Sequence, residues 1–225
     1  MKNKRHTYKC STSIKFAIAA VAALIAGQFS ASSSSAALVS ISAPASVVPG
    51  ALTSASDVYI FFESTQELAD PLNVDIITPG LYNLANPDDP GVIPADTKVA
   101  SYMIHHDSVG FLPNTAAVTY VFPKKVLGLI LNDRNLDTSD PIVGNPGTTY
   151  PTGLAYRGLE VPYTFLNDVV FWNGNQVTVT GKSTTALVID QIRVITAVPE
   201  PSTFVLAAMA LPIVWLIRQR RSRTK

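Results

Sequence analysis

An uncharged apolar segment near the C-terminus, Thr203 to Ile217, most constrains how this chain can fold. As an α-helix it would be roughly 23 Å long, a little shorter than the ~30 Å hydrocarbon core of a bilayer. A basic tail follows it, with Arg218, Arg220, Arg221, Arg223 and Lys225. Because basic flanks stay cytoplasmic, we expect a transmembrane helix with the chain before Val198 outside. The alternative is a buried core helix followed by a solvated tail.

Directly before this segment stands Pro199-Glu200-Pro201. A short proline-flanked motif, an apolar segment and a basic tail in this order resemble the PEP-CTERM sorting signal of exported bacterial proteins. The resemblance implies that residues 198–225 are a sorting signal, recognised at Pro199, Glu200 and Pro201 by an exosortase in the membrane. It also implies that the protein ends at the cell surface or in the extracellular matrix.

The N-terminus predicts a secretory signal peptide over residues 1–37. A lysine-rich start precedes the apolar run from Phe16 to Gly27, and small residues fill positions 30–37. This order is typical of targeting peptides, with cleavage after Ala36 or Ala37. The alternative is an uncleaved N-terminal anchor. The only cysteine, Cys10, would leave with the peptide, so we expect the exported chain to have no thiol, no disulfide and no Cys-based metal site.

The charge of the chain is unevenly distributed. Residues 38–198 carry fifteen acidic side chains against seven Lys and Arg, a formal net charge of −8. An acidic domain lacks the basic surface that nucleic acids require, so nucleic acid is excluded as a partner.

Residues 38–197 read as a single all-β domain, a β-sandwich or jelly roll. Short runs rich in aromatic and β-branched residues predict strands at 57–63, 98–106, 117–122, 125–131, 168–172, 175–180 and 185–196. Asn173-Gly174 between two of these runs predicts a type I′ hairpin. Only Ser64 to Leu68 looks like a helical turn, and residues 131–160 look like a long irregular connection.

Several segments of the second half resemble a recurrent PEP-CTERM exported domain. They are residues 136–140, 146–151, 157–160 and 188–196. That domain has no established activity, so the resemblance implies architecture and location only.

One candidate metal site is visible in the sequence. Asp133, Asn135 and Asp137 have the 1-3-5 spacing of oxygen ligands in a calcium loop. Thr138 replaces the glycine of position 6, and Gly144 replaces the bidentate glutamate of position 12. Calcium is therefore a weak candidate cofactor, and a polar turn with Asx caps is the alternative.

Other motifs favour structural interpretations. His105 and His106 are adjacent in a predicted strand, so they should face opposite sides and not share a zinc ion. Gly181-Lys182-Ser183 lacks the leading glycine and following helix of a P-loop. Trp172, Tyr150, Tyr156 and Tyr163 are candidates for a sugar-stacking platform, or for ordinary core aromatics.

We therefore expect a non-catalytic, exosortase-sorted protein of the cell surface or extracellular matrix, associated with exopolysaccharide or biofilm. No catalytic residue is assigned. One alternative is a carbohydrate-binding module on the same β-sandwich. Another is an envelope glycan hydrolase, which needs two exposed carboxylates roughly 5–10 Å apart.

Overall fold

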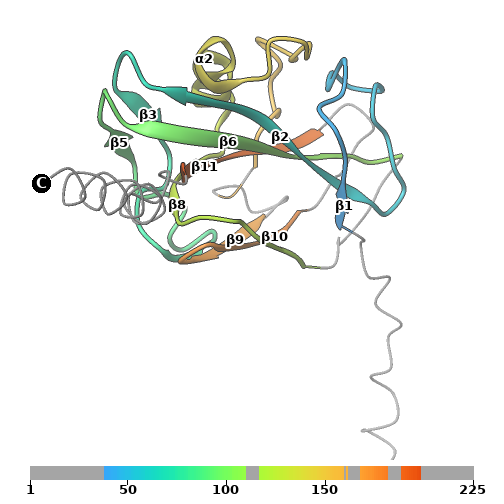
Figure 1. Ribbon diagram of the computed structural model, residues 1–225. Helices are drawn as coiled ribbons and strands as arrows, with labels where there is room; N and C mark the ends of the chain where they lie inside the picture. The colour runs from blue at the N-terminus through green and yellow to red at the C-terminus, as the bar shows by residue number, and fades with distance from the viewer. Residues whose placement is uncertain (1–37, 110–116, 160, 162–167, 182–188, 199–225) are drawn as a thin grey trace, which may run out of the picture. The chain divides into compact units, whose positions relative to one another are not determined.

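The computed structural model describes residues 38–109, 117–159, 161, 168–181 and 189–198 (Figure 1). Within these ranges the chain forms eleven strands and one helix, α2 (Asp133–Val143). The predicted all-β class is confirmed. Described residues all belong to a compact unit that starts at Ser35. None of the helices in the described ranges is long and apolar enough to span a membrane.

The strands form two main sheets and a ribbon. The five-stranded sheet has the order β1 (Leu38–Ser40), β2 (Val58–Glu67), β6 (Lys98–Asp107), β11 (Ile189–Ala197) and β8 (Val126–Ile130). The four-stranded sheet has the order β4 (Gly80–Tyr82), β9 (Val169–Asn173), β10 (Gln176–Thr180) and β7 (Val118–Val121). A two-stranded ribbon pairs β3 (Leu72–Val74) with β5 (Gly91–Ile93).

The five-stranded sheet is covered on both faces. In Figure 1, helix α2 lies on one side of β2 and β6, whereas β9 and β10 lie on the other. One hydrophobic cluster, including Ile60, Trp172 and Val194, fills the space between the sheets. A second cluster, including Met103 and Leu136, lies beneath α2 and the ribbon. Burying both faces explains why β11 is almost wholly buried along its length.

Strand alternation sends neighbouring side chains of β11 into different layers. Ile192 and Val194 belong to the cluster between the sheets, whereas Ile195 belongs to the cluster beneath α2. Arg193 shares the α2 side, where its guanidinium bonds to Leu136 and Ser139 of the helix. This alternation decides which polar residues meet α2.

The hairpin predicted at Asn173-Gly174 is present, but its turn type was wrong. Asn173 pairs with Gln176, so Gly174 and Asn175 are the two central turn residues. Gly174 has φ +62°, whereas Asn175 is not among the residues with positive φ. A single positive φ on a glycine at the first central position is the pattern of type II′ rather than type I′. Trp172 reinforces the turn, since its indole N–H donates to the Gly174 carbonyl at 3.1 Å.

Two local predictions are corrected. Ser64 to Leu68 is not a helical turn, because Ser64 to Glu67 continue β2 in register with β6. The connection at 131–160 contains helix α2, which sequence periodicity did not reveal. Its buried face consists of only Leu136, Ser139 and Val143, so the apolar stripe that announces most surface helices is too sparse.

Candidate functional site

The segment proposed as a calcium loop is the start of helix α2. Asn132 is the N-cap, and its side-chain oxygen accepts the Asn135 N–H at 2.8 Å. Asp133, Asn135 and Asp137 therefore occupy the first turns of a helix rather than a calcium loop, and the Asx cap of the alternative interpretation is present at Asn132, where it starts this helix. An asparagine cap followed by an aspartate in the first turn stabilises a helix start.

The side chains of these candidates have protein partners. Asp133 accepts three backbone N–H groups, from residues 156–158, at 2.9–3.0 Å. Asp137 accepts the Gly153 N–H at 2.8 Å and an Arg157 guanidinium N–H at 2.7 Å. Through these hydrogen bonds, Asp133 and Asp137 hold residues 153–158, which follow α2 in the chain, against the helix. Among the described residues, no group of three or more His, Cys, Asp or Glu side chains is arranged to hold a metal ion.

Beneath α2 lies a set of charged side chains that we call the buried ionic cluster: Glu63, Asp137, Asp140, Arg157 and Arg193. The Arg193 guanidinium donates twice to Glu63, from Nε to Oε2 and from Nη2 to Oε1, each at 2.8 Å. Its Nη2 also donates to Asp140 at 2.9 Å. Burial alone would lower the pKa of Arg193, but the carboxylates of Glu63 and Asp140 raise it, so the group stays charged.

Arg157 supplies the second cation of the buried ionic cluster. Its Nη1 and Nη2 donate to the two oxygens of Asp140 at 2.7 and 2.8 Å. Its Nε donates to Gln191 Oε1 at 2.7 Å. Asp140 thus accepts hydrogen bonds from both arginines, and it lies on α2 while Arg193 lies on β11. The helix is held to the sheet by charge-assisted hydrogen bonds.

Tyr150 closes one side of this cluster. Its hydroxyl donates to Glu63 Oε1 at 2.6 Å and accepts the Asn145 N–H at 2.8 Å. The guanidinium carbons of Arg157 and Arg193 stand 5.7 and 5.3 Å from its ring centre, within cation–π range. Burial and the neighbouring Glu63 carboxylate raise the pKa of Tyr150, so the hydroxyl keeps its proton.

The buried ionic cluster has the character of a scaffold rather than a reaction centre. Its arginines are 0% exposed, and each carries several hydrogen bonds. Charges buried at this cost persist when they are fully paired and hydrogen-bonded. Sequence analysis missed it, although Arg193 in the middle of a predicted strand and Glu63 after an aromatic run were visible signs.

His105 and His106 point to opposite faces of β6, as predicted. His105 lies on the α2 side, where its Nδ1 is 3.0 Å from Gln191 Nε2. That amide nitrogen is a donor, because Gln191 Oε1 already accepts from Arg157, so the imidazole is neutral with its proton on Nε2. Burial, with smaller contributions from His106 and Arg157, lowers the pKa of His105 to about 4.

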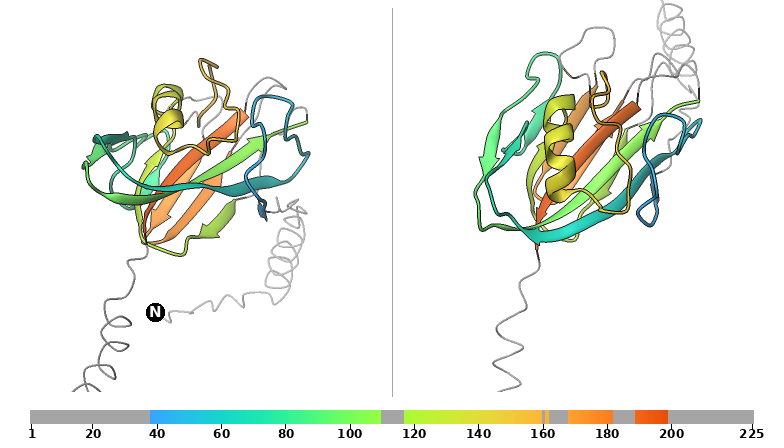
Figure 2. Two further views of the ribbon diagram at one scale, coloured as in Figure 1. Left: turned by 45° about the horizontal axis from the view of Figure 1, so that its top comes forward. Right: turned by 90° about the horizontal axis from the view of Figure 1, so that it is seen from above.

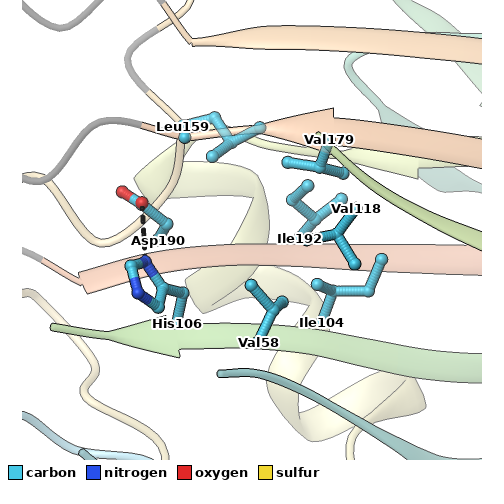
Figure 3. Close-up of a pocket in the computed structure, with 9 residues that line it drawn as sticks. Val58, Ile104, His106, Val118, Leu159, Val179, Asp190 and Ile192 are labelled. Atoms are coloured by element: carbon cyan, nitrogen blue, oxygen red, sulfur yellow. Dashed lines mark hydrogen bonds and ion pairs between the residues drawn. The ribbon is translucent and has the colours of Figure 1, made fainter. Parts of the chain in front are cut away.

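His106 lies between the sheets instead. Its Nδ1 is 3.5 Å from Asp190 Oδ2, at the end of a cavity of about 20 Å³ that Figure 3 shows lined mainly by Val58, Ile104 and other aliphatic side chains. Within the described chain, His106 Nε2 and Asp190 Oδ1 have no hydrogen-bond partner. The cavity has room for about one water molecule, which excludes an organic substrate.

A larger, polar depression runs between α2 and the β3–β5 ribbon, and we call it the α2 groove. It measures about 620 Å³. Its walls are formed by Asn73, Val74, Asp75, Asp88, Pro90, Gly91, Val92, Asn132, Arg134, Asn135 and Thr138. Asn135, one of the three residues predicted as calcium ligands, therefore lines the α2 groove.

Asp75 organises the inner end of the α2 groove. Its Oδ2 accepts the N–H groups of Leu131 and Asn132 at 2.7 and 2.9 Å. Its Oδ1 accepts the amides of Asn132 and Asn135, the latter at 2.6 Å. Burial raises the pKa of Asp75, and these hydrogen bonds partly oppose that rise. Since both oxygens accept from the protein, Asp75 is a positioning group and not an acid facing a substrate.

Among the residues that the structure describes, the aromatic platform considered from sequence does not form. Trp172 is 1% exposed in the core between the sheets. Tyr150 belongs to the α2 side, against the buried arginines, and Tyr156 is exposed. Tyr163 lies outside the described residues. Core packing, not sugar stacking, explains the placement of Trp172.

Several predicted features lie outside the described residues. They are the signal peptide 1–37, Lys182 and Ser183 of the P-loop-like motif, Pro199, Glu200 and Pro201, the apolar segment 203–217, and the basic tail with Arg218, Arg220, Arg221 and Arg223. Comparisons with protein-family models, curated proteins and solved structures found no match to this chain.

Proposed function

We propose that this chain is a non-catalytic, PEP-CTERM-type protein that is exported across the bacterial inner membrane and sorted by an exosortase to the cell surface or extracellular matrix. Its exported part is a β-sandwich domain spanning residues 38–197. Residues 1–37 are the signal peptide, and residues 198–225 form the sorting signal with its transmembrane helix and basic tail. An association with exopolysaccharide or biofilm follows from that location.

One observation carries the proposal. Pro199-Glu200-Pro201, an uncharged apolar segment and a basic tail follow one another within residues 199–225, in the order typical of a sorting signal. The strands of the described residues form two main sheets and a ribbon within residues 38–197, the part of the chain that these signals would deliver.

Two groups of charged residues in the described chain have structural partners. The arginines of the buried ionic cluster form ion pairs with carboxylates of the same chain. Both oxygens of Asp75 accept hydrogen bonds from protein donors. The hydrolase alternative needs two exposed carboxylates roughly 5–10 Å apart, and Asp75 does not suit that role because both of its oxygens accept hydrogen bonds from the protein. A carbohydrate-binding role remains the second candidate, favoured by the polar α2 groove rather than by aromatic side chains.

The sorting role is tested by replacing Pro199, Glu200 and Pro201 with alanine in the producing bacterium. Export and signal-peptide removal should continue, while the chain accumulates in the membrane fraction. A matched control replaces the exposed Pro94 and Pro123 with alanine, which should leave sorting unchanged. Surface display of the triple variant equal to wild type would refute the sorting role.

A further inference from the structure

The α2 groove has the size of a ligand site. Its volume of about 620 Å³ falls within the range of roughly 300–1,000 Å³ found for small-molecule sites. Its lining residues come from α2, with the adjoining Asn132, and from the β3–β5 ribbon with the segments beside it, and Figure 2 shows α2, in yellow, lying over the long strands of the five-stranded sheet. Two independent elements thus contribute opposite walls.

The groove exposes polar groups that the fold leaves unused. Within the described chain, Arg134, Asp88 and Asn73 make no hydrogen bond or ion pair with another residue through their side chains. The Arg134 guanidinium offers N–H donors, the Asp88 carboxylate accepts hydrogen bonds, and the Asn73 amide both donates and accepts. Thr138 adds a hydroxyl that already donates to the Asn135 carbonyl at 3.2 Å. Pro90 and the half-exposed Val92 add apolar surface to the same groove.

The walls of the groove are fixed before any ligand arrives. Asp75 ties the ribbon side to Asn132 and Asn135 at the start of α2. The other side of α2 is held to the sheet through Asp140 of the buried ionic cluster. A site with immobilised walls loses less conformational entropy on binding than a mobile one.

The α2 groove combines acidic, basic, amide and apolar side chains, and this combination favours one chemical class of ligand. A polyanion would be opposed by Asp88 and by the formal net charge of −8 over residues 38–198. A metal ion would be opposed by Arg134, and Asp75 has no oxygen without a protein donor. Neutral sugars suit the groove, because each hydroxyl both donates and accepts while the C–H face of the ring packs on apolar side chains.

We infer that the α2 groove binds a short stretch of neutral polysaccharide, with Arg134, Asp88 and Asn73 contacting its hydroxyl groups. This inference rests on the proposed association with exopolysaccharide and names the surface that makes the contact. The ligand is recognised by hydrogen bonds and by Val92 and Pro90, and not by a tryptophan or tyrosine platform.

The test is a glycan microarray carrying neutral and acidic oligosaccharides, probed with the detergent-solubilised full chain. We expect binding to neutral glycans, and at least a tenfold loss of affinity for Arg134→Ala and for Asp88→Asn. Matched controls are Lys124→Ala and Asp70→Asn, which remove the same charges at exposed positions outside the groove. Both controls should bind as wild type does.

Three results would overturn the inference: no binding to any neutral glycan, binding to acidic glycans only, or neutral-glycan binding that survives both groove substitutions. Circular dichroism of each variant excludes unfolding as the cause of a loss. Sorting is read separately, because Arg134→Ala should leave surface delivery unchanged and the Pro199-Glu200-Pro201 variant should keep its affinity for glycans. Failure of one proposal is therefore distinguishable from failure of the other.

Discussion

Arg193 and Glu63 stand 130 residues apart in the chain and form a two-point ion pair, with Nε–Oε2 and Nη2–Oε1 distances of 2.8 Å. Both side chains are fully buried. Glu63 reaches this position through a register shift between Phe62 and Ser64 in β2, since an irregularity of this kind re-aims the side chain at that point. The pair joins β2 to β11, the two strands that flank the central strand β6, beneath α2.

Removing one member of this pair should be far more costly than removing both. We expect Glu63→Gln to lower the free energy of unfolding by about 3–5 kcal/mol, because it leaves the Arg193 charge buried without its main partner. Glu63→Gln combined with Arg193→Met should recover much of that loss. Urea unfolding monitored by circular dichroism measures both.

The matched control is the exposed pair Lys98–Glu67, whose charged atoms are 3.9 Å apart. Lys98→Ala should change stability by less than about 1 kcal/mol, because solvent screens exposed pairs. Equal effects at Lys98 and Glu63 would contradict the structural role assigned to the buried pair.

The neutral state of His105 predicts a loss of stability in acid. Its pKa is about 4 in the folded chain and about 6.5 when unfolded. Between these values the unfolded chain binds the extra proton, so the free energy of unfolding falls as pH drops from about 6.5 to 4 and levels off below. The full shift corresponds to about 3 kcal/mol.

His105→Gln isolates this effect, because glutamine cannot titrate. Urea unfolding at pH 7.5 and pH 4.5 should show a smaller acid-induced loss for the variant than for the wild-type chain. Other groups also titrate in this range, so the difference between the two proteins is the quantity of interest. An identical loss in both would show that His105 does not contribute.

Gly158 predicts a steric effect. A methyl group at this position would overlap the backbone carbonyl of Leu131, which already accepts the Leu159 N–H at 2.9 Å. Gly158→Ala should therefore cost about 2 kcal/mol or more through overpacking. Gly147→Ala is the control, since its methyl would meet only the Asn145 side chain at 3.2 Å. Thermal unfolding measures the melting temperature of both variants. Equal melting temperatures would contradict the close packing of Gly158 against the Leu131 carbonyl.

The proposed role of the basic tail in membrane retention is tested by removing its charges while keeping its length. Replacing Arg218, Arg220, Arg221 and Arg223 with glutamine should weaken membrane retention, because uncharged tails translocate more easily. Lysine at the same four positions keeps the charge and should retain the chain as wild type does. Fractionation of cells and medium measures the distribution. Normal retention of the glutamine variant would argue against an anchoring role for the tail.

Local pattern alone located most of the central strands. Alternating β-branched and aromatic residues identified β2, β6, β9 and β10 within one or two residues at most of their ends, and Asn173-Gly174 marked the hairpin. Such features depend on neighbours along the chain, so the sequence carries them directly. The short strands β1, β3, β4 and β5 were missed, because three residues give too little periodicity to recognise.

The candidate site depended on contacts that no local pattern contains. Asp133 and Asp137 have calcium-loop spacing, but Asn132 caps a helix and residues 153–158 supply donors from beyond its end. The α2 groove exists only because the β3–β5 ribbon folds beside α2. The sequence by itself determined the β-rich class and the acidic charge of residues 38–198, and it predicts targeting signals at both ends of that part. Tertiary structure decided which charges are buried as pairs and which remain exposed, because desolvation and pairing depend on distance in space and not along the chain.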